Sequence, residues 1–135
     1  MKVSFGNVDG NGWESYSHKV LRIKYLDEDY VRVPAKYGGD LGIESFTKTG
    51  RAFQCYCPDG EPNSDELYDK QRNKITRDIS KLIKNGVELT SLGVPKIKKW
   101  YLVTPRYENK ELLAHCQKKT TEVKKETCKH IDTDF

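Results

Sequence analysis

At 135 residues the chain has the length of one compact domain, and its hydrophobic content of 36% is too high for a disordered segment. We expect residues 1–135 to form a single domain, the N-terminal part of a longer protein. The net charge of +4 permits nucleic-acid binding but does not require it. No apolar run could span a membrane and the N-terminus does not resemble a secretion signal, so we expect a cytoplasmic protein with no membrane partner.

The first predicted helix covers residues 13–26, because Asn11 and Glu14 have the spacing of a capping box. Helical spacing places the following side chains on one face: Trp13, Tyr16, Ser17, Val20, Leu21 and Lys24. A β-prone run over 30–33 comes next, and the glycine-rich stretch 36–40 predicts a loop.

A hairpin and a long helix are predicted for the middle of the chain. Two β-prone runs, 43–47 and 51–57, are separated by a turn that contains Gly50, as in an antiparallel hairpin. Ser64 then offers an N-cap for a basic amphipathic helix over 64–85.

The last third of the chain predicts a strand and another helix. Residues 98–104 are rich in aromatic and β-branched types and predict a buried strand. Residues 109–126 predict a helix whose inward side chains are Leu112, Leu113, Cys116, Thr120 and Val123. The tail 128–135 has the pattern of a strand that begins and is not completed. The whole predicts an α/β fold with a mixed central sheet flanked by helices.

The cysteines and histidines predict no site of their own. The four cysteines do not have the spacing of two zinc knuckles, so free thiols are favoured over a zinc site; they are Cys55, Cys57, Cys116 and Cys128. The three histidines are scattered, with no serine or cysteine at nucleophile-elbow spacing, and are assigned no role; they are His18, His115 and His130.

The predicted loop and hairpin carry the residues most suited to chemistry. The sequence GGDLGIE over residues 38–44 is followed by FQCY over residues 53–56 on the second strand. Acids on such a loop, with an oxygen ligand on the strand after it, suit Mg²⁺, which prefers oxygen ligands and keeps several waters. This pattern resembles the Mrr-like restriction-endonuclease branch of the PD-(D/E)XK superfamily.

The resemblance implies a restriction-endonuclease-like core with a Mg²⁺ or Mn²⁺ site formed by Asp40, Glu44 and Gln54. The family has an aspartate at the position of Glu44, and at the position of Tyr56 a lysine that orients the attacking water. A neutral tyrosine supplies no positive charge beside the phosphate, and electrostatic stabilisation is usually the largest catalytic contribution. The candidate catalytic residues are therefore Asp40, Glu44, Gln54 and Tyr56, in a site without its usual lysine.

Structural alternatives exist for these residues. Glu14 stands where the family often has an acid on its first helix, but the capping box is the preferred explanation. Asp40 also suits a turn, and Gln54 and Tyr56 share a strand face that is either a polar site or a solvated surface. Basic side chains that could replace the lysine are Lys19, Lys48 and Arg51.

The resemblance also implies partners. It suggests a nuclease-like domain of a bacterial restriction or phage-defence system that binds DNA rather than RNA, has an effector or ATPase partner, and is compatible with a homodimer. The helix over 64–85 carries basic residues suited to phosphates, namely Lys70, Lys74, Arg77, Lys81 and Lys84. Two functions stay open: a degenerate domain that binds nucleic acid or a protein partner, and an active Mg²⁺-dependent DNA endonuclease with another residue in the lysine's role.

Overall fold

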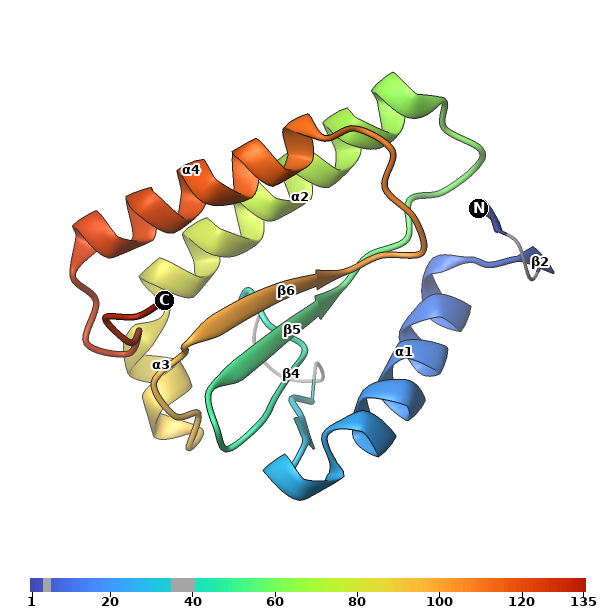
Figure 1. Ribbon diagram of the computed structural model, residues 1–135. Coiled ribbons are helices and arrows are strands. Elements are labelled where there is room, and N and C mark those ends of the chain that lie inside the picture. The colour runs from blue at the N-terminus through green and yellow to red at the C-terminus, as the bar shows by residue number, and fades with distance from the viewer. Residues whose placement is uncertain (4–5, 35–40) are drawn as a thin grey trace.

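The computed structural model describes residues 1–3, 6–34 and 41–135, and shows an α/β protein with a mixed four-stranded sheet and several helices (Figure 1). The sheet has the spatial order β3 (Val31–Arg32), β4 (Ser45–Phe46), β5 (Arg51–Cys55) and β6 (Lys99–Val103). Neighbours β3, β4 and β5 are antiparallel, and β6 runs parallel to β5. A separate small hairpin joins β1 (Lys2–Val3) to β2 (Gly6–Asn7).

Helices cover both faces of this sheet (Figure 1). Helix α1 (Gly10–Lys24) lies on one face, while α2 (Ser64–Lys84) and α4 (Glu111–Glu126) lie side by side on the other. We call these the α1 face and the α2 face. A short 3-10 helix η1 (Leu26–Glu28) follows α1, and α3 (Gly86–Ser91) follows α2. No helix in the described ranges is long and apolar enough to cross a membrane.

Local hydrogen bonds decide where the helices begin. Asp9, and not the predicted Asn11, caps α1 by accepting from a backbone N–H of the first turn. Asn63, and not Ser64, caps α2, and it forms a capping box with Glu66. Both predicted helices are therefore present, but their capping residues differ from those that the sequence pattern indicated, and α1 begins three residues earlier than predicted.

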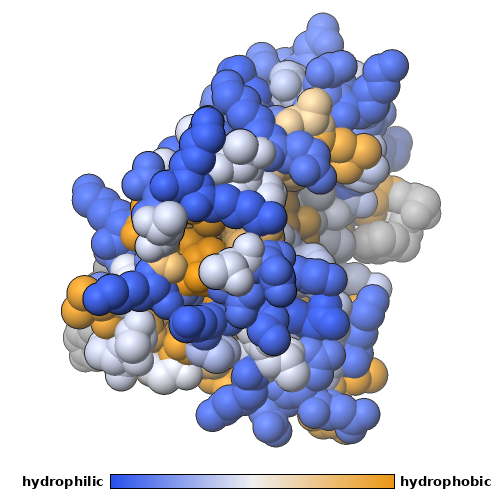
Figure 2. Space-filling model, turned by 60° about the vertical axis from the view of Figure 1, so that its left-hand side comes forward, coloured by the Kyte–Doolittle hydropathy of each residue, from blue (hydrophilic) through white to orange (hydrophobic). Residues whose placement is uncertain are grey.

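The main hydrophobic core fills the α2 face. Ala52 of β5 packs there with apolar side chains of α2 and α4, namely Ile75, Ile79, Leu82, Leu112 and Val123. The prediction for α4 is partly wrong, because Leu113 is 56% exposed and Cys116 is also exposed. On the outer surface, Figure 2 shows hydrophilic side chains over most of one face, with apolar atoms visible in a hollow between them.

The chain entering the hairpin lies directly against α2. Gly42 has a φ of 88°, and a Cβ added to it would lie 2.3 Å from the carbonyl oxygen of Asp78 and 2.8 Å from the amide nitrogen of Leu82. The indole of Trp100 donates to the Gly42 carbonyl at 2.9 Å. Only glycine fits this contact without moving backbone, so the helix and the start of the hairpin are held at a fixed separation.

The C-terminal segment closes one edge of the fold. Strand β6 is the last strand of the described sheet and is half-exposed, so the expectation of a buried strand is wrong. The predicted further strand is limited to a single parallel bridge between Ile97 and Ile131. His130 donates from Nε2 to the carbonyl of Leu82 at 2.6 Å, and its ring fills the space beside Gly86.

Candidate functional site

Strand β5 separates the residues of the predicted metal site. Its side chains alternate between the two faces, because it pairs regularly with β6 along its whole length. Phe53 packs against Tyr25 and thus faces α1, and Cys55 lies on the same side. Ala52 belongs to the core of the α2 face. Gln54, two residues further on and 2% exposed, therefore lies on the α2 face.

Glu44 lies on the opposite face. Its backbone N–H donates to the Phe53 carbonyl at 2.8 Å, although Ser45 is the register partner of Phe53. Glu44 and Ser45 therefore both stand opposite Phe53, which is the arrangement of a β-bulge. A bulge changes the direction in which a side chain points. The Glu44 carboxylate lies 3.7 Å from Nε2 of His18 on α1. The structure therefore does not bring Glu44 and Gln54 together, and Asp40 lies outside the described residues.

A polar cluster occupies the α1 face instead. We call Glu14, His18, Glu44 and Cys55 the α1-face cluster. The ligand atoms of His18, Glu44 and Cys55 all lie within 4.8 Å of one another. Oε1 of Glu14 is also 3.7 Å from Nε2 of His18, and the same oxygen accepts a hydrogen bond from Arg32 at 2.9 Å. Three potential metal ligands from α1, the bulge and β5 thus converge, and Glu14 lies beside one of them, His18.

Hydrogen bonds fix the orientation of the histidine. The Tyr30 hydroxyl donates its proton to Oγ of Ser45 at 2.8 Å, and its oxygen is also hydrogen-bonded to Nδ1 of His18. Since the hydroxyl proton is used on Ser45, Nδ1 is the donor to Tyr30. Nε2 therefore points its lone pair toward the cluster when the ring is neutral. Burial raises the pKa of Tyr30, so its hydroxyl keeps its proton at neutral pH.

The interior of the cluster contains polar atoms whose hydrogen-bonding capacity is unused within the described residues. The His18 side chain is only 5% exposed, and within the described residues neither its Nε2 nor Oε2 of Glu44 makes a hydrogen bond. Burial, and then the negative charge of Glu44, raises the pKa of Cys55 to about 12. The thiol is therefore protonated and unreactive at neutral pH unless a cation enters the cluster.

The α2 face presents a different surface at Tyr56. Tyr56 and the side chains of α2 line an open hollow of about 400 Å³, with Lys70, Asn73, Thr76 and Arg77 as the other lining residues. Nζ of Lys74 lies 5.8 Å from the centre of the Tyr56 ring and 3.0 Å from the buried carboxylate of Asp78. Burial raises the pKa of Tyr56, so its hydroxyl is neutral at neutral pH.

The predicted basic residues form a stripe along α2. Their spacing of four, three, four and three residues keeps them on one side of the helix, and Lys70, Arg77 and Lys84 are exposed. Lys74 and Lys81 are partly buried. Because Lys74 is paired with Asp78, the residues best placed to bind phosphates are Lys70, Arg77 and Lys84.

The basic residues considered as replacements for the lysine lie elsewhere. Arg51 donates to Glu28 at 2.9 Å and its guanidinium lies 5.0 Å from the centre of the Tyr25 ring. It stands at the opposite end of β5 from the cluster. Lys19 and Lys48 are exposed on α1 and on the hairpin turn. These side chains are therefore not part of the α1-face cluster.

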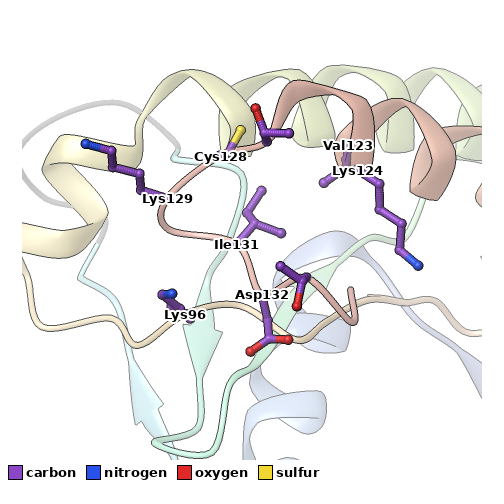
Figure 3. Close-up of a pocket in the computed structure, with 9 residues that line it drawn as sticks. Lys96, Val123, Lys124, Cys128, Lys129, Ile131 and Asp132 are labelled. Carbon is purple, nitrogen blue, oxygen red and sulfur yellow. The ribbon is translucent and has the colours of Figure 1, made fainter.

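A second hollow lies beside the C-terminal tail. It has a volume of about 260 Å³ and an apolar wall that includes Val123 and Ile131 (Figure 3). Lys124 and Lys129 extend from its rim away from Ile131, and Lys96 lies below it (Figure 3). Its lining holds one carboxylate, Asp132, but no imidazole. The hollow therefore offers a basic rim without the convergent ligands of the α1-face cluster.

Sequence reasoning missed His18. The face predicted for the first helix included Tyr16 and Val20, which are 52% and 43% exposed, but not His18, which is 4% exposed. The available signal was its position four residues after Glu14, since side chains at this spacing meet on a helix. Its burial depends on Tyr30 and the bulge at Glu44, which the local pattern of the helix does not reveal.

No family model, curated protein or solved structure matches the chain. Its functional interpretation therefore depends on the residues themselves.

Proposed function

We propose that the chain is a restriction-endonuclease-like domain that binds DNA through α2 and does not cleave it. The observation that carries this proposal is the separation of Glu44 and Gln54 on opposite faces of the sheet. An ion held by Glu44 cannot also be held by Gln54 across a packed sheet. With tyrosine in the lysine's position, the oxygen ligands and the positive charge of the nuclease mechanism are both disrupted.

The order of elements supports the same fold family. Along the chain, helix α1 comes before the antiparallel hairpin of β4 and β5. Helix α2 follows the hairpin, and the later strand β6 runs parallel to β5. This is the order that the sequence resemblance implies for the nuclease core. The acid on the first helix, Glu14, also lies beside the acid of the hairpin, Glu44, with His18 between them.

DNA binding is supported by the stripe on α2. Lys70, Arg77 and Lys84 are exposed on one side of a helix of 21 residues, and the hollow at Tyr56 opens between the first two. Lysine and arginine at this spacing can follow a phosphate backbone, and each phosphate contact contributes to a salt-dependent affinity. The neutral Tyr56 ring adds a surface on which an unpaired base could stack.

A salt series tests this proposal. We expect binding of a DNA duplex at low salt, with a logarithmic slope of about −0.9 per phosphate contact. The triple variant Lys70→Gln, Arg77→Gln and Lys84→Gln should lower both the affinity and the slope. The matched control is Lys118→Gln, Lys124→Gln and Lys125→Gln on α4, which removes the same charge from exposed positions. Equal losses in the two variants, or no binding at low salt, would contradict a role for the stripe.

The alternative is an active Mg²⁺-dependent endonuclease, and Lys74 is the observation in its favour. Its Nζ lies 5.8 Å from the Tyr56 ring and so places a positive charge near the family's lysine position. We expect no plasmid cleavage with Mg²⁺ or Mn²⁺ by the unmodified chain or by Tyr56→Lys, since Glu44 stays on the other face. Cleavage that is lost in Glu44→Gln would overturn the binding-only proposal and support this alternative.

A further inference from the structure

We propose that the α1-face cluster is a zinc site, with Nε2 of His18, a carboxylate oxygen of Glu44 and the sulfur of Cys55 as ligands. Glu14 is placed to supply the fourth ligand. This inference goes beyond the proposed DNA binding and does not depend on it, because neither Gln54 nor the α2 stripe takes part.

The separations of the ligand atoms fit a tetrahedral ion after a small contraction. Zinc bonds of about 2.0–2.1 Å to nitrogen or oxygen and about 2.3 Å to sulfur place tetrahedral ligands roughly 3.3–3.6 Å apart. Nε2 of His18 is 3.7 Å from both Glu14 and Glu44. Cys55 completes a group whose atoms lie within 4.8 Å of one another. Side-chain movements of about 1 Å would therefore bring the ligand atoms to tetrahedral separations.

The chemistry of the ligands selects the metal. Mg²⁺ and Ca²⁺ are bound by oxygen atoms, whereas imidazole and thiolate ligands suit zinc and other soft or borderline ions. A set of one imidazole, one thiolate and two carboxylates is therefore a poor magnesium site and a suitable zinc site. Glu44, the residue that would bind Mg²⁺ in a nuclease, would here bind zinc together with His18 and Cys55.

The surrounding residues orient the ligands as in natural zinc sites. A metal-bound histidine usually donates its other ring N–H to an oxygen, which fixes the tautomer and the direction of the lone pair. Here Nδ1 of His18 donates to Tyr30, and Tyr30 is held in turn by Ser45. The bulge that directs Glu44 toward α1 and the ion pair of Arg32 with Glu14 position the carboxylates.

Zinc would also satisfy buried polar atoms of the cluster. His18 Nε2 and Glu44 Oε2 are buried without hydrogen bonds from the described residues, and an ion bound between them would satisfy both. Binding breaks the S–H bond of Cys55 and forms a zinc–sulfur bond, and the released proton passes to solvent. No oxidant or reductant is needed. Because the ligands come from α1, the bulge and β5, the ion would fasten the helix to the sheet.

Cobalt substitution tests the site directly. Purified protein is stripped with a chelator and titrated with Co²⁺ and then Zn²⁺, while absorption, metal content and melting temperature are recorded. We expect one equivalent of metal, a sulfur-to-cobalt charge-transfer band that Zn²⁺ removes, and a higher melting temperature with zinc. Cys55→Ser and His18→Asn should each lose the band. The matched control is Cys57→Ser, at another buried cysteine outside the cluster, which should retain it.

The remaining outcomes separate this site from the DNA proposal. Gln54→Ala and the α2 triple variant should bind zinc like the unmodified chain. X-ray absorption of the zinc complex should show one sulfur neighbour with nitrogen and oxygen neighbours. Folded, reduced protein that binds no equivalent of Co²⁺ or Zn²⁺, or a band that persists in Cys55→Ser, overturns the site. Loss of DNA binding would leave these readouts unchanged, so the two proposals fail separately.

Discussion

The two faces of the sheet are built on different principles. The α2 face holds the main hydrophobic core, with Gly42 closely packed against α2, and it also buries the polar side chains of Gln54, Gln71 and Asp78. The α1 face has a polar interior in which His18, Tyr30 and Ser45 form a chain of hydrogen bonds beside Glu44. The main apolar core therefore lies on the α2 face, whereas the α1 face holds a hydrogen-bonded group of potential metal ligands.

The strongest test of this contrast is Gly42→Ala. The added Cβ would meet backbone atoms of α2 at 2.3 Å, and alanine is strained at a φ of 88°. We expect a loss of about 3–6 kcal/mol in the free energy of unfolding, measured by urea denaturation. The matched control is Gly93→Ala, at a φ of 86° with no atom within 4 Å of the new Cβ, where only the strain of about 1 kcal/mol remains. Similar losses at both positions would show that the contact with α2 is not close-packed.

The next test concerns the buried ion pair of the α2 face. Lys74→Met removes the ammonium group that lies 3.0 Å from the carboxylate of Asp78, whose side chain is 1% exposed. We expect a loss of about 2–4 kcal/mol in urea denaturation, because removing one partner of a buried ion pair is costly. Lys70→Met, one turn earlier on the exposed surface, should change stability by less than about 0.5 kcal/mol. If both substitutions have the same small effect, the buried carboxylate of Asp78 does not depend on Lys74 for its stability.

The smallest effect on stability is expected on the α1 face. Tyr30→Phe removes the acceptor for His18 and the donor to Ser45, so the metal-free protein should lose about 1–2 kcal/mol. The same change should weaken zinc binding about 10–100-fold, because the imidazole loses its orienting partner. Tyr107→Phe, at a tyrosine that is 51% exposed, serves as the control and should alter neither quantity. Unchanged zinc affinity in Tyr30→Phe would remove the tyrosine from the site.

The sequence predicted the elements better than their faces. The helices 13–26, 64–85 and 109–126 correspond to α1, α2 and α4, because hydrophobic spacing of helical period is a local signal. The hairpin was also confirmed, since Gly50 with a φ of 105° provides its turn. The short helix α3 was missed, because the glycine at its start reads as a helix end.

The candidate site was harder to predict, for two physical reasons. The bulge at Glu44 reverses the face expected from simple alternation, and it is defined by hydrogen bonds between strands rather than by residue types. Gln54 and Tyr56 were correctly placed on one face, but that face lies away from Glu44. The burial of His18 depends on a tyrosine that follows the end of its helix. Local patterns therefore indicated which residues are chemically capable, and tertiary contacts determined which of them meet.

The contact of His130 with α2 has a consequence for the order of folding. The imidazole joins residues 48 positions apart in the sequence, by donating to Leu82 beside the notch at Gly86. Closing so long a loop costs conformational entropy, which is repaid only after α4 has paired with α2 and brought the tail nearby. The bridge between Ile97 and Ile131 depends on the same approach. We therefore expect residues 128–135 to join the edge of the domain beside α3 late in folding, after α2 has formed from local interactions.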